Sequence, residues 1–150
     1  METKTKILVV GFLCAGIWIG ILIFRRRSVK LVWPLIGRIT SEFGEWRTTG
    51  THTGIDIAAK AGTPIQSPAD GQVERVFFNS VGGNQLLIRH LGGLQTGYAH
   101  LSKTLVKAGQ RVKQNQVIGN VGNTGRSTGP HLHFTVTHLG IKQNPRDYLV

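Results

Sequence analysis

The chain is short of cysteine and of acidic residues, and each shortage restricts what it can be. Cys14 is the only cysteine among 150 residues, which excludes an internal disulfide, a thiolate zinc finger and a dithiol redox site. Seven Asp and Glu stand against 18 Lys and Arg, a formal net charge of +11. A charge of this sign suits nucleic acid, anionic lipid or an acidic wall polymer, and does not choose among them.

The chain contains one long uncharged run, ILVVGFLCAGIWIGILIF, at residues 7–24. As a helix its 18 residues would extend about 27 Å, close to the thickness of a bilayer core. Lys4 and Lys6 precede the run and no small-x-small cleavage site follows it, which favours an uncleaved membrane anchor over a removed signal peptide. We therefore expect an anchor with a basic flank at residues 1–30 and one folded domain at residues 31–150.

The charges around this run bear on which side of a membrane the following domain would lie. Four cations follow the run, at positions 25, 26, 27 and 30, and two precede it. The positive-inside rule would therefore keep the following domain in the cytoplasm. The sequence leaves the topology open.

The rest of the chain alternates short β-rich runs with turn residues, and helical patterns are scarce. This pattern predicts an all-β, antiparallel domain. Residues 103–116 are polar and irregular, and they are expected to form a loop with at most one strand. The expected strands are Ile36–Thr40, Gly54–Ala58, Pro64–Ser67, Gly71–Phe78, Gln85–His90, Gln95–Leu101, Val117–Val121 and His131–His138.

The most specific chemical signal comes from histidines. His131 and His133 lie two apart in a predicted strand, so they share a face about 6.7 Å apart and can converge on one small site. His52 and Asp56 lie four apart, and roughly 13 Å of extended chain would separate them too far to share one ion. The chain must bend between them, and Gly54 permits that bend. The isolated His90 and His138 are expected to be surface or hydrogen-bonded residues.

Four segments together resemble the lysostaphin-type, or LytM-like, zinc metallo-endopeptidases, which cut peptide cross-links in bacterial cell walls. They fall in the family's order and extend over most of residues 37–149. The resemblance implies a LytM-like sheet domain with a substrate groove between loops over the sheet. The segments are THTGIDIAAKAGTPIQSPADGQV (residues 51–73), GNQLLIRH (83–90), TGYAHLS (96–102) and GNVGNTGRSTGPHLHF (119–134).

Carried over to this chain, the resemblance implies one Zn²⁺ per domain. It makes His52, Asp56 and His133 the zinc ligands, and His100 and His131 the catalytic pair. Two positions depart from the family pattern. Thr135 stands where the family usually has Glu or Gln, and Asn115 stands where Gly is common. Thr135 shares a strand face with the ligating histidine, so a weaker supporting contact and an altered rate or affinity are expected.

The expected function is a membrane-anchored zinc metallo-endopeptidase that hydrolyses peptide bonds in peptidoglycan. This function implies a single-pass protein of the bacterial inner membrane with its domain on the outer, periplasmic side, which conflicts with the charges that flank the uncharged run. Two imidazoles and a carboxylate leave an open fourth position at zinc, where a water molecule can be activated. Either His100 or His131 could take the water's proton while the other hydrogen-bonds the oxyanion, and the sequence does not decide between them. Arg47, Lys60 and Arg126 could hold an anionic polymer or simply face solvent.

Two rival functions stay open at this point. The first is a wall-binding or regulatory module without hydrolysis, which membrane anchoring and Thr135 favour but a complete ligand set opposes. The second is a cytoplasm-facing nucleic-acid binder, suggested by the net charge. The sequence lacks basic residues interleaved with aromatics, so no nucleic-acid partner is expected. The bond cleaved and the oligomeric state are not determined by the sequence.

Overall fold

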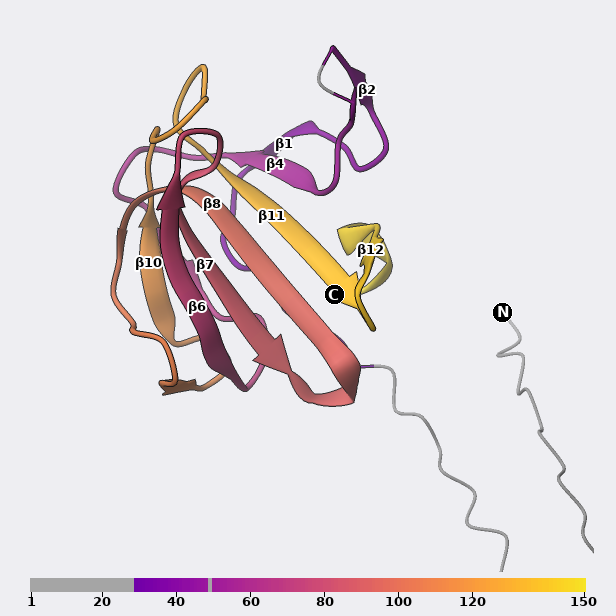
Figure 1. Cartoon of the computed structure of the whole chain (residues 1–150), viewed down its shortest axis with the longest axis vertical. Helices are drawn as coiled ribbons and strands as arrows, with labels where there is room; N and C mark the ends of the chain where they lie inside the picture. The colour runs from indigo at the N-terminus through magenta and orange to yellow at the C-terminus, as the bar shows by residue number, and fades with distance from the viewer. Residues whose placement is uncertain (1–28, 49) are drawn as a thin grey trace, which may run out of the picture.

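The computed structural model describes residues 29–48 and 50–150 (Figure 1). Within these ranges the chain forms antiparallel strands and two short 3-10 turns, with no α-helix. This confirms the all-β prediction. The expected membrane anchor at residues 7–24 lies outside the described residues. Among the described residues, no helix is long and apolar enough to cross a membrane.

Most strands belong to one large, strongly curved sheet, and β2 and β3 form a separate small hairpin above it (Figure 1). The two 3-10 turns are η1 (Leu91–Gly93) and η2 (Pro145–Asp147). The strands are β1 (Arg38–Ser41), β2 (Trp46–Arg47), β3 (Gly50–Thr51), β4 (Ile55–Ala58), β5 (Pro64–Gln66), β6 (Gly71–Asn79), β7 (Gly83–His90), β8 (Leu94–Thr104), β9 (Arg111–Val112), β10 (Val117–Val121), β11 (His131–His138) and β12 (Ile141–Gln143).

The order of the main sheet places β11 between β4 and β8 and continues through β7 and β6 to β9. Along β11 the side chains alternate between the two faces of the sheet. Leu132, Phe134 and Val136 point into the hydrophobic core and are fully buried. His131 and His133 therefore lie on the opposite face of the sheet.

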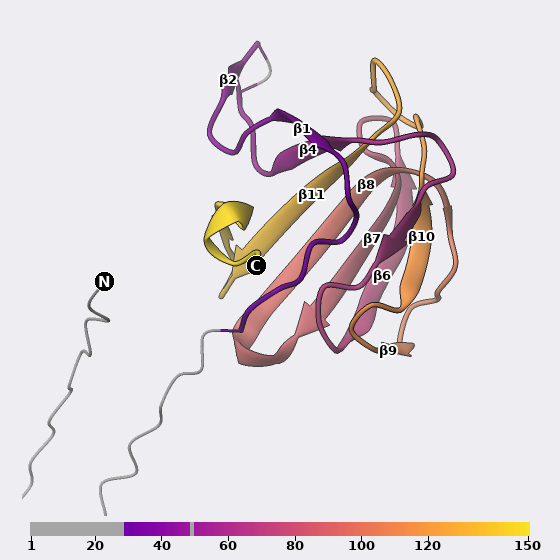
Figure 2. The same cartoon turned by 180° about the vertical axis from the view of Figure 1, so that it is seen from behind.

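The start of the described chain is fixed to the folded domain. Leu31 is fully buried, donates its backbone N–H to the Tyr148 carbonyl at 3.0 Å and bridges to Leu149. From there the chain runs along the domain to reach β1 at the other end (Figure 2). Residues 29–31 are therefore part of the folded domain and not a free linker.

All eight predicted strands are present, and β10 and β11 have the predicted bounds. The sequence missed β2, β3 and β12. β9 is the one strand wholly within residues 103–116, and β8 extends into that range as far as Thr104. β2, β3, β9 and β12 have only two or three residues each, too few for an alternation of apolar and polar side chains to show. Their pairing depends on neighbouring strands rather than on their own composition.

Candidate metal centre

The pairing of β4 with β11 creates the first two members of the site. Asp56 is the cross-strand partner of His133, so their side chains project from neighbouring strands on the same face. His133 Nδ1 lies 2.8 Å from Asp56 Oδ1. Alternation along β11 sets the face on which His133 lies, and the register of β11 with β4 places Asp56 directly beside it.

His52 joins them from the segment just before β4. Its Nε2 lies 3.1 Å from Asp56 Oδ1 and 3.0 Å from His133 Nδ1. The chain bends at Gly54, as the spacing requires, but the reason for glycine differs from the expected one. Gly54 does not adopt a positive φ. Instead, a Cβ there would lie 2.2 Å from the carbonyl oxygen of Phe134, so only glycine lets the bend pack against β11.

The tautomer of His52 is set by its second ring nitrogen. Nδ1 lies 2.7 Å from the carbonyl oxygen of Glu42, which can only accept a hydrogen bond. Nδ1 therefore carries the proton, and Nε2 of the neutral ring offers a lone pair to the site. A hydrogen bond of this kind is the usual way in which proteins orient a metal-binding imidazole.

The three side chains fit a zinc ion. His52 Nε2, Asp56 Oδ1 and His133 Nδ1 lie 2.8–3.1 Å apart, and His52 and Asp56 are buried. Tetrahedral ligands with bonds of about 2.0–2.1 Å would be about 3.3 Å apart, close to these values. Two imidazoles and one carboxylate are also a ligand set of catalytic zinc sites, which keep a fourth position open. The group satisfies the geometry of a metal site.

The second oxygen of Asp56 is held by Arg47, a contact that the sequence did not reveal. Arg47 donates from Nη2 to Asp56 Oδ2 at 2.6 Å and also contacts Ser41 Oγ. Burial alone would raise the pKa of the Asp56 carboxyl, but hydrogen bonds from His133 and Arg47 hold the pKa well below its usual range. Asp56 is therefore a carboxylate at neutral pH, with one oxygen left for the centre of the site.

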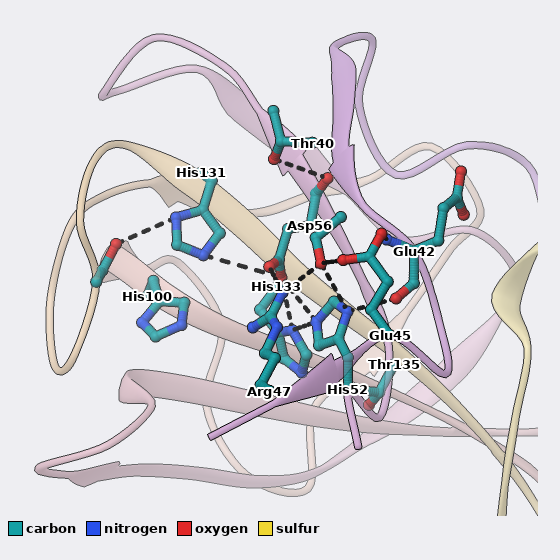
Figure 3. A network of polar contacts seen from close by, with 12 residues as sticks. Thr40, Glu42, Glu45, Arg47, His52, Asp56, His100, His131, His133 and Thr135 are labelled. Atoms are coloured by element: carbon teal, nitrogen blue, oxygen red, sulfur yellow. Dashed lines mark hydrogen bonds and ion pairs between the residues drawn. The ribbon is translucent and has the colours of Figure 1, made fainter. Parts of the chain in front are cut away.

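His131 and His100 lie together beside this cluster, with ring centroids 4.6 Å apart (Figure 3). His131 Nε2 is 3.9 Å from Asp56 Oδ1. Its Nδ1 donates to the Gly129 carbonyl at 2.8 Å, which leaves the lone pair of the neutral ring on Nε2. His131 is thus close enough to reach a water molecule or substrate atom next to the three candidate ligands.

His100 occupies an unusual position in β8. Its φ is 63°, in the left-handed region that few non-glycine residues adopt, and β8 changes partner there. Ala99 pairs with β11 whereas Leu101 pairs with β10. Nδ1 of His100 donates to the Thr124 carbonyl at 2.8 Å, and burial lowers the pKa of the ring. Burial favours the neutral imidazole, against the opposing effect of the hydrogen bond to Thr124. In the neutral ring that hydrogen bond keeps the proton on Nδ1 and leaves the lone pair on Nε2.

The remaining positions singled out from the sequence have structural explanations. Thr135 is buried, and its Oγ1 accepts a hydrogen bond from Lys142 Nζ at 3.2 Å. Asn115 has a φ of 65°, so it adopts the conformation for which glycine is favoured. His90 and His138 are hydrogen-bonded outside the site, His90 to Asp70 and Thr96 and His138 to a backbone carbonyl.

Comparison with known proteins identifies the family of this chain. The family model described as peptidase family M23 matches residues 50–145, the range that contains the five candidate site residues. The chain belongs to peptidase family M23. It is 47% identical over 115 residues to the peptidoglycan DD-endopeptidase ShyC of Vibrio cholerae, covering 73% of this chain and 27% of that protein. It is 45% identical over 121 residues to the DD-carboxypeptidase/endopeptidase Mpg of Neisseria meningitidis, covering 75% of this chain and 27% of that protein.

Solved structures of other proteins share the fold of this M23 chain. A zinc-containing peptidase from Vibrio cholerae superposes with a TM-score of 0.73 at 37% identity, covering 78% of this chain and 39% of that one. The catalytic domain of lysostaphin from Staphylococcus simulans superposes with a TM-score of 0.70 at 32% identity, covering 75% and 91%. The chain spans about a quarter of the length of the curated relatives quoted above.

Proposed function

We propose that this M23 protein is a membrane-anchored zinc endopeptidase that hydrolyses peptide bonds in bacterial peptidoglycan. The observation that carries the proposal is the convergence of His52 Nε2, Asp56 Oδ1 and His133 Nδ1 to within 2.8–3.1 Å. A second pair of histidines, His100 and His131, stands beside that cluster with unprotonated nitrogens in their neutral rings. A metal site with three protein ligands and adjacent bases suits hydrolysis, whereas a purely structural zinc site usually has four protein ligands and no open position.

His52, Asp56 and His133 would hold the ion. When bound, zinc supplies a Lewis acid that polarises a peptide carbonyl and lowers the pKa of a water molecule in its open position. Glu42 fixes the ring of His52 through its carbonyl oxygen, and Arg47 fixes the carboxylate of Asp56. These contacts hold the ligand atoms in position before substrate arrives.

His100 and His131 would manage protons. Each donates its Nδ1–H to a backbone carbonyl, so the Nε2 of the neutral ring can accept a proton from water. The protonated ring can then donate to the developing oxyanion or to the leaving amine nitrogen. The lowered pKa of His100 keeps this ring neutral at neutral pH. Both assignments of base and oxyanion donor satisfy these contacts.

The substrate class follows from the relatives. Two of them, at 47% and 42% identity, carry the name peptidoglycan DD-endopeptidase. The net charge of +11 also suits a wall polymer that carries carboxylates. We propose that the uncharged run at residues 7–24 anchors the protein in the inner membrane with its domain on the outer side, where that substrate lies.

The direct test is to incubate the purified full-length protein with isolated wall sacculi and to measure soluble peptide fragments by liquid chromatography and mass spectrometry. We expect release that stops on adding a chelator and returns with zinc. His133→Ala should abolish release, because it removes one of the three ligand atoms. His138→Ala is the matched control, since His138 lies outside the site, and it should release fragments at the wild-type rate.

The same assay separates hydrolysis from its rival. Retained binding to sacculi without any fragment release, in a protein shown to be folded and to contain zinc, would contradict the proposal and favour a wall-binding module. A C-terminal reporter that is active only in the cytoplasm would contradict the proposed topology. Mass analysis of the fragments also identifies which peptide bond is cut.

A further inference from the structure

The end of the domain away from the metal centre combines exposed aliphatic and basic side chains. Leu91 is 81% exposed and Leu139 is 69% exposed, although both are large and apolar. They are neighbours, because Leu139 donates its backbone N–H to Gly93, which follows Leu91 in the η1 turn. We name this surface the basal face and define it by Lys30, Arg89, Leu91, Arg111, Lys113 and Leu139.

A pocket of about 330 Å³ opens in the basal face. Arg89, Arg111 and Lys113 line it together with a single carboxylate, Asp70, which leaves a net charge of +2. Asp70 is engaged by Lys113 at 3.0 Å, and Arg89 is paired with Glu74 at 3.1 Å. Among the described residues, no carboxylate pairs with Arg111. The pocket therefore offers a cationic hollow beside an exposed leucine, a combination that suits an anionic headgroup with an acyl chain attached.

The path of the chain brings this face close to the expected anchor. Val29 lies against Gly92 of the η1 turn, and Leu31 is fixed by Tyr148 and Leu149. Only residues 25–28 separate Val29 from the end of the uncharged run at Phe24. That interval spans at most about 18 Å, whatever its conformation. The sequence alone allowed a longer tether, because it did not show that residues 29–31 belong to the folded domain.

We propose that the basal face docks onto an anionic lipid bilayer, with Leu91 and Leu139 at the interface and the pocket cations on lipid phosphates. The proposal rests on the anchor proposed above but not on hydrolysis. In the sequence, Arg25, Arg26 and Arg27 add three further cations among the four residues that precede Val29. A domain tethered this closely keeps its cations within a few Debye lengths of the lipid charges, since that length is about 8–10 Å at ordinary salt.

Docking in this way would set the direction in which the candidate metal centre faces. β11 runs from the site to the basal face, with His138 Nε2 donating to the Gly92 carbonyl at 3.1 Å. Five residue steps separate His133 from His138, which corresponds to about 17 Å of strand. The metal centre would then face away from the bilayer and toward the wall, with β11 as a spacer of fixed length.

The test uses the full-length protein in vesicles, with Cys14→Ala to remove the native thiol and an environment-sensitive fluorophore on Leu91→Cys. In bilayers containing phosphatidylglycerol we expect a blue-shifted emission, reduced in phosphatidylcholine alone and reversed at 1 M salt, where the Debye length is only about 3 Å. The matched control carries the fluorophore on Val81→Cys. Val81 is an exposed apolar residue in the β6–β7 turn, whose carbonyl groups accept hydrogen bonds from the backbone N–H groups of His100 and Arg126. Its label should report water in every bilayer.

Charge reversal identifies the cations involved. Arg111→Glu should remove most of the lipid-dependent shift at position 91, whereas Lys103→Glu, an exposed cation paired with β10, should leave it unchanged. Equal emission at positions 91 and 81, or a shift insensitive to lipid charge, would overturn docking and leave hydrolysis untouched. A shift produced by sacculi but not by lipid would assign the face to the wall polymer and also overturn it. A protein that does not float with vesicles would overturn both the anchor and the docking.

Discussion

Asp56 divides its two oxygens between the candidate metal centre and Arg47. Oδ1 faces His52 and His133, whereas Oδ2 accepts from the guanidinium of Arg47 at 2.6 Å. The charged hydrogen bond fixes the orientation of the carboxylate, which a free side chain could not keep. Arg47 is therefore a positioning residue of the site. The sequence could not reveal this role, because the β2–β3 hairpin that carries Arg47 has strands of only two residues.

Arg47→Ala should weaken zinc binding by roughly 10- to 100-fold, the usual cost of losing an outer contact of a metal ligand. Competition with a chromophoric chelator measures the affinity. Arg126→Ala is the control, since Arg126 is exposed and only its backbone is hydrogen-bonded in the described structure. An unchanged zinc affinity in Arg47→Ala would show that Asp56 is positioned without Arg47.

His100 combines the proposed role in proton transfer with a backbone conformation that few side chains adopt. At a φ of 63° asparagine is tolerated, whereas a β-branched residue is strained. His100→Asn should lower the hydrolytic rate by about 10²- to 10⁴-fold, because the ring nitrogen is lost, while zinc content and folding stability are kept. His100→Val should lower the rate and also destabilise the fold by about 1–2 kcal/mol.

Rate measurements on sacculi, combined with urea unfolding, separate the two effects. A wild-type rate in His100→Asn would remove His100 from the catalytic pair. Equal stability of the Asn and Val variants would show that the left-handed conformation carries no strain.

At the scale of elements, β6, β7 and β8 are joined by a buried chain of polar groups. His90 Nδ1 donates to the Asp70 carbonyl at 2.9 Å, and its Nε2 lies 2.7 Å from Thr96 Oγ1. Thr96 Oγ1 in turn lies 2.8 Å from the hydroxyl of Tyr98. The chain is satisfied when the imidazole is neutral, with Thr96 donating to His90 and Tyr98 donating to Thr96. His90, the last residue of β7, therefore links the start of β6 to β8 through hydrogen bonds, and its role is structural and not catalytic.

This arrangement predicts how stability depends on pH. Burial lowers the pKa of His90, against the opposing effect of its hydrogen bond to Asp70. The unfolded chain then binds more protons than the folded one below the unfolded pKa of about 6.5, so stability falls as pH falls through that value. The free energy of unfolding, measured in urea with excess chelator, should be lower at pH 5.5 than at pH 8.

His90→Gln isolates the contribution of this imidazole. At pH 8 the variant should lose about 1–3 kcal/mol, because buried partners lose hydrogen bonds. It should also lose less stability than the wild type between pH 8 and pH 5.5. If its pH dependence equals that of the wild type, the titration arises from other histidines.

At the scale of the whole molecule, the sequence predicted what depends on periodicity and missed what depends on distant contacts. The alternation of side chains along residues 131–138 predicted the strand and placed His131 and His133 on the same face of it. The need for a bend before Asp56 followed from spacing alone. The partner change of β8 at His100 and the fixing of Leu31 by the chain's last residues could not be foreseen, since each depends on segments far apart in the sequence.

The metal content of the purified full-length protein tests the central claim most directly. After equilibration with zinc and removal of the excess, elemental analysis should find one zinc per chain in the wild type and in His138→Ala. Asp56→Ala and His133→Ala, shown to be folded by circular dichroism, should retain little or none. A folded wild-type chain that binds no zinc, or a His133→Ala variant that keeps a full equivalent, would contradict a metal centre built from His52, Asp56 and His133.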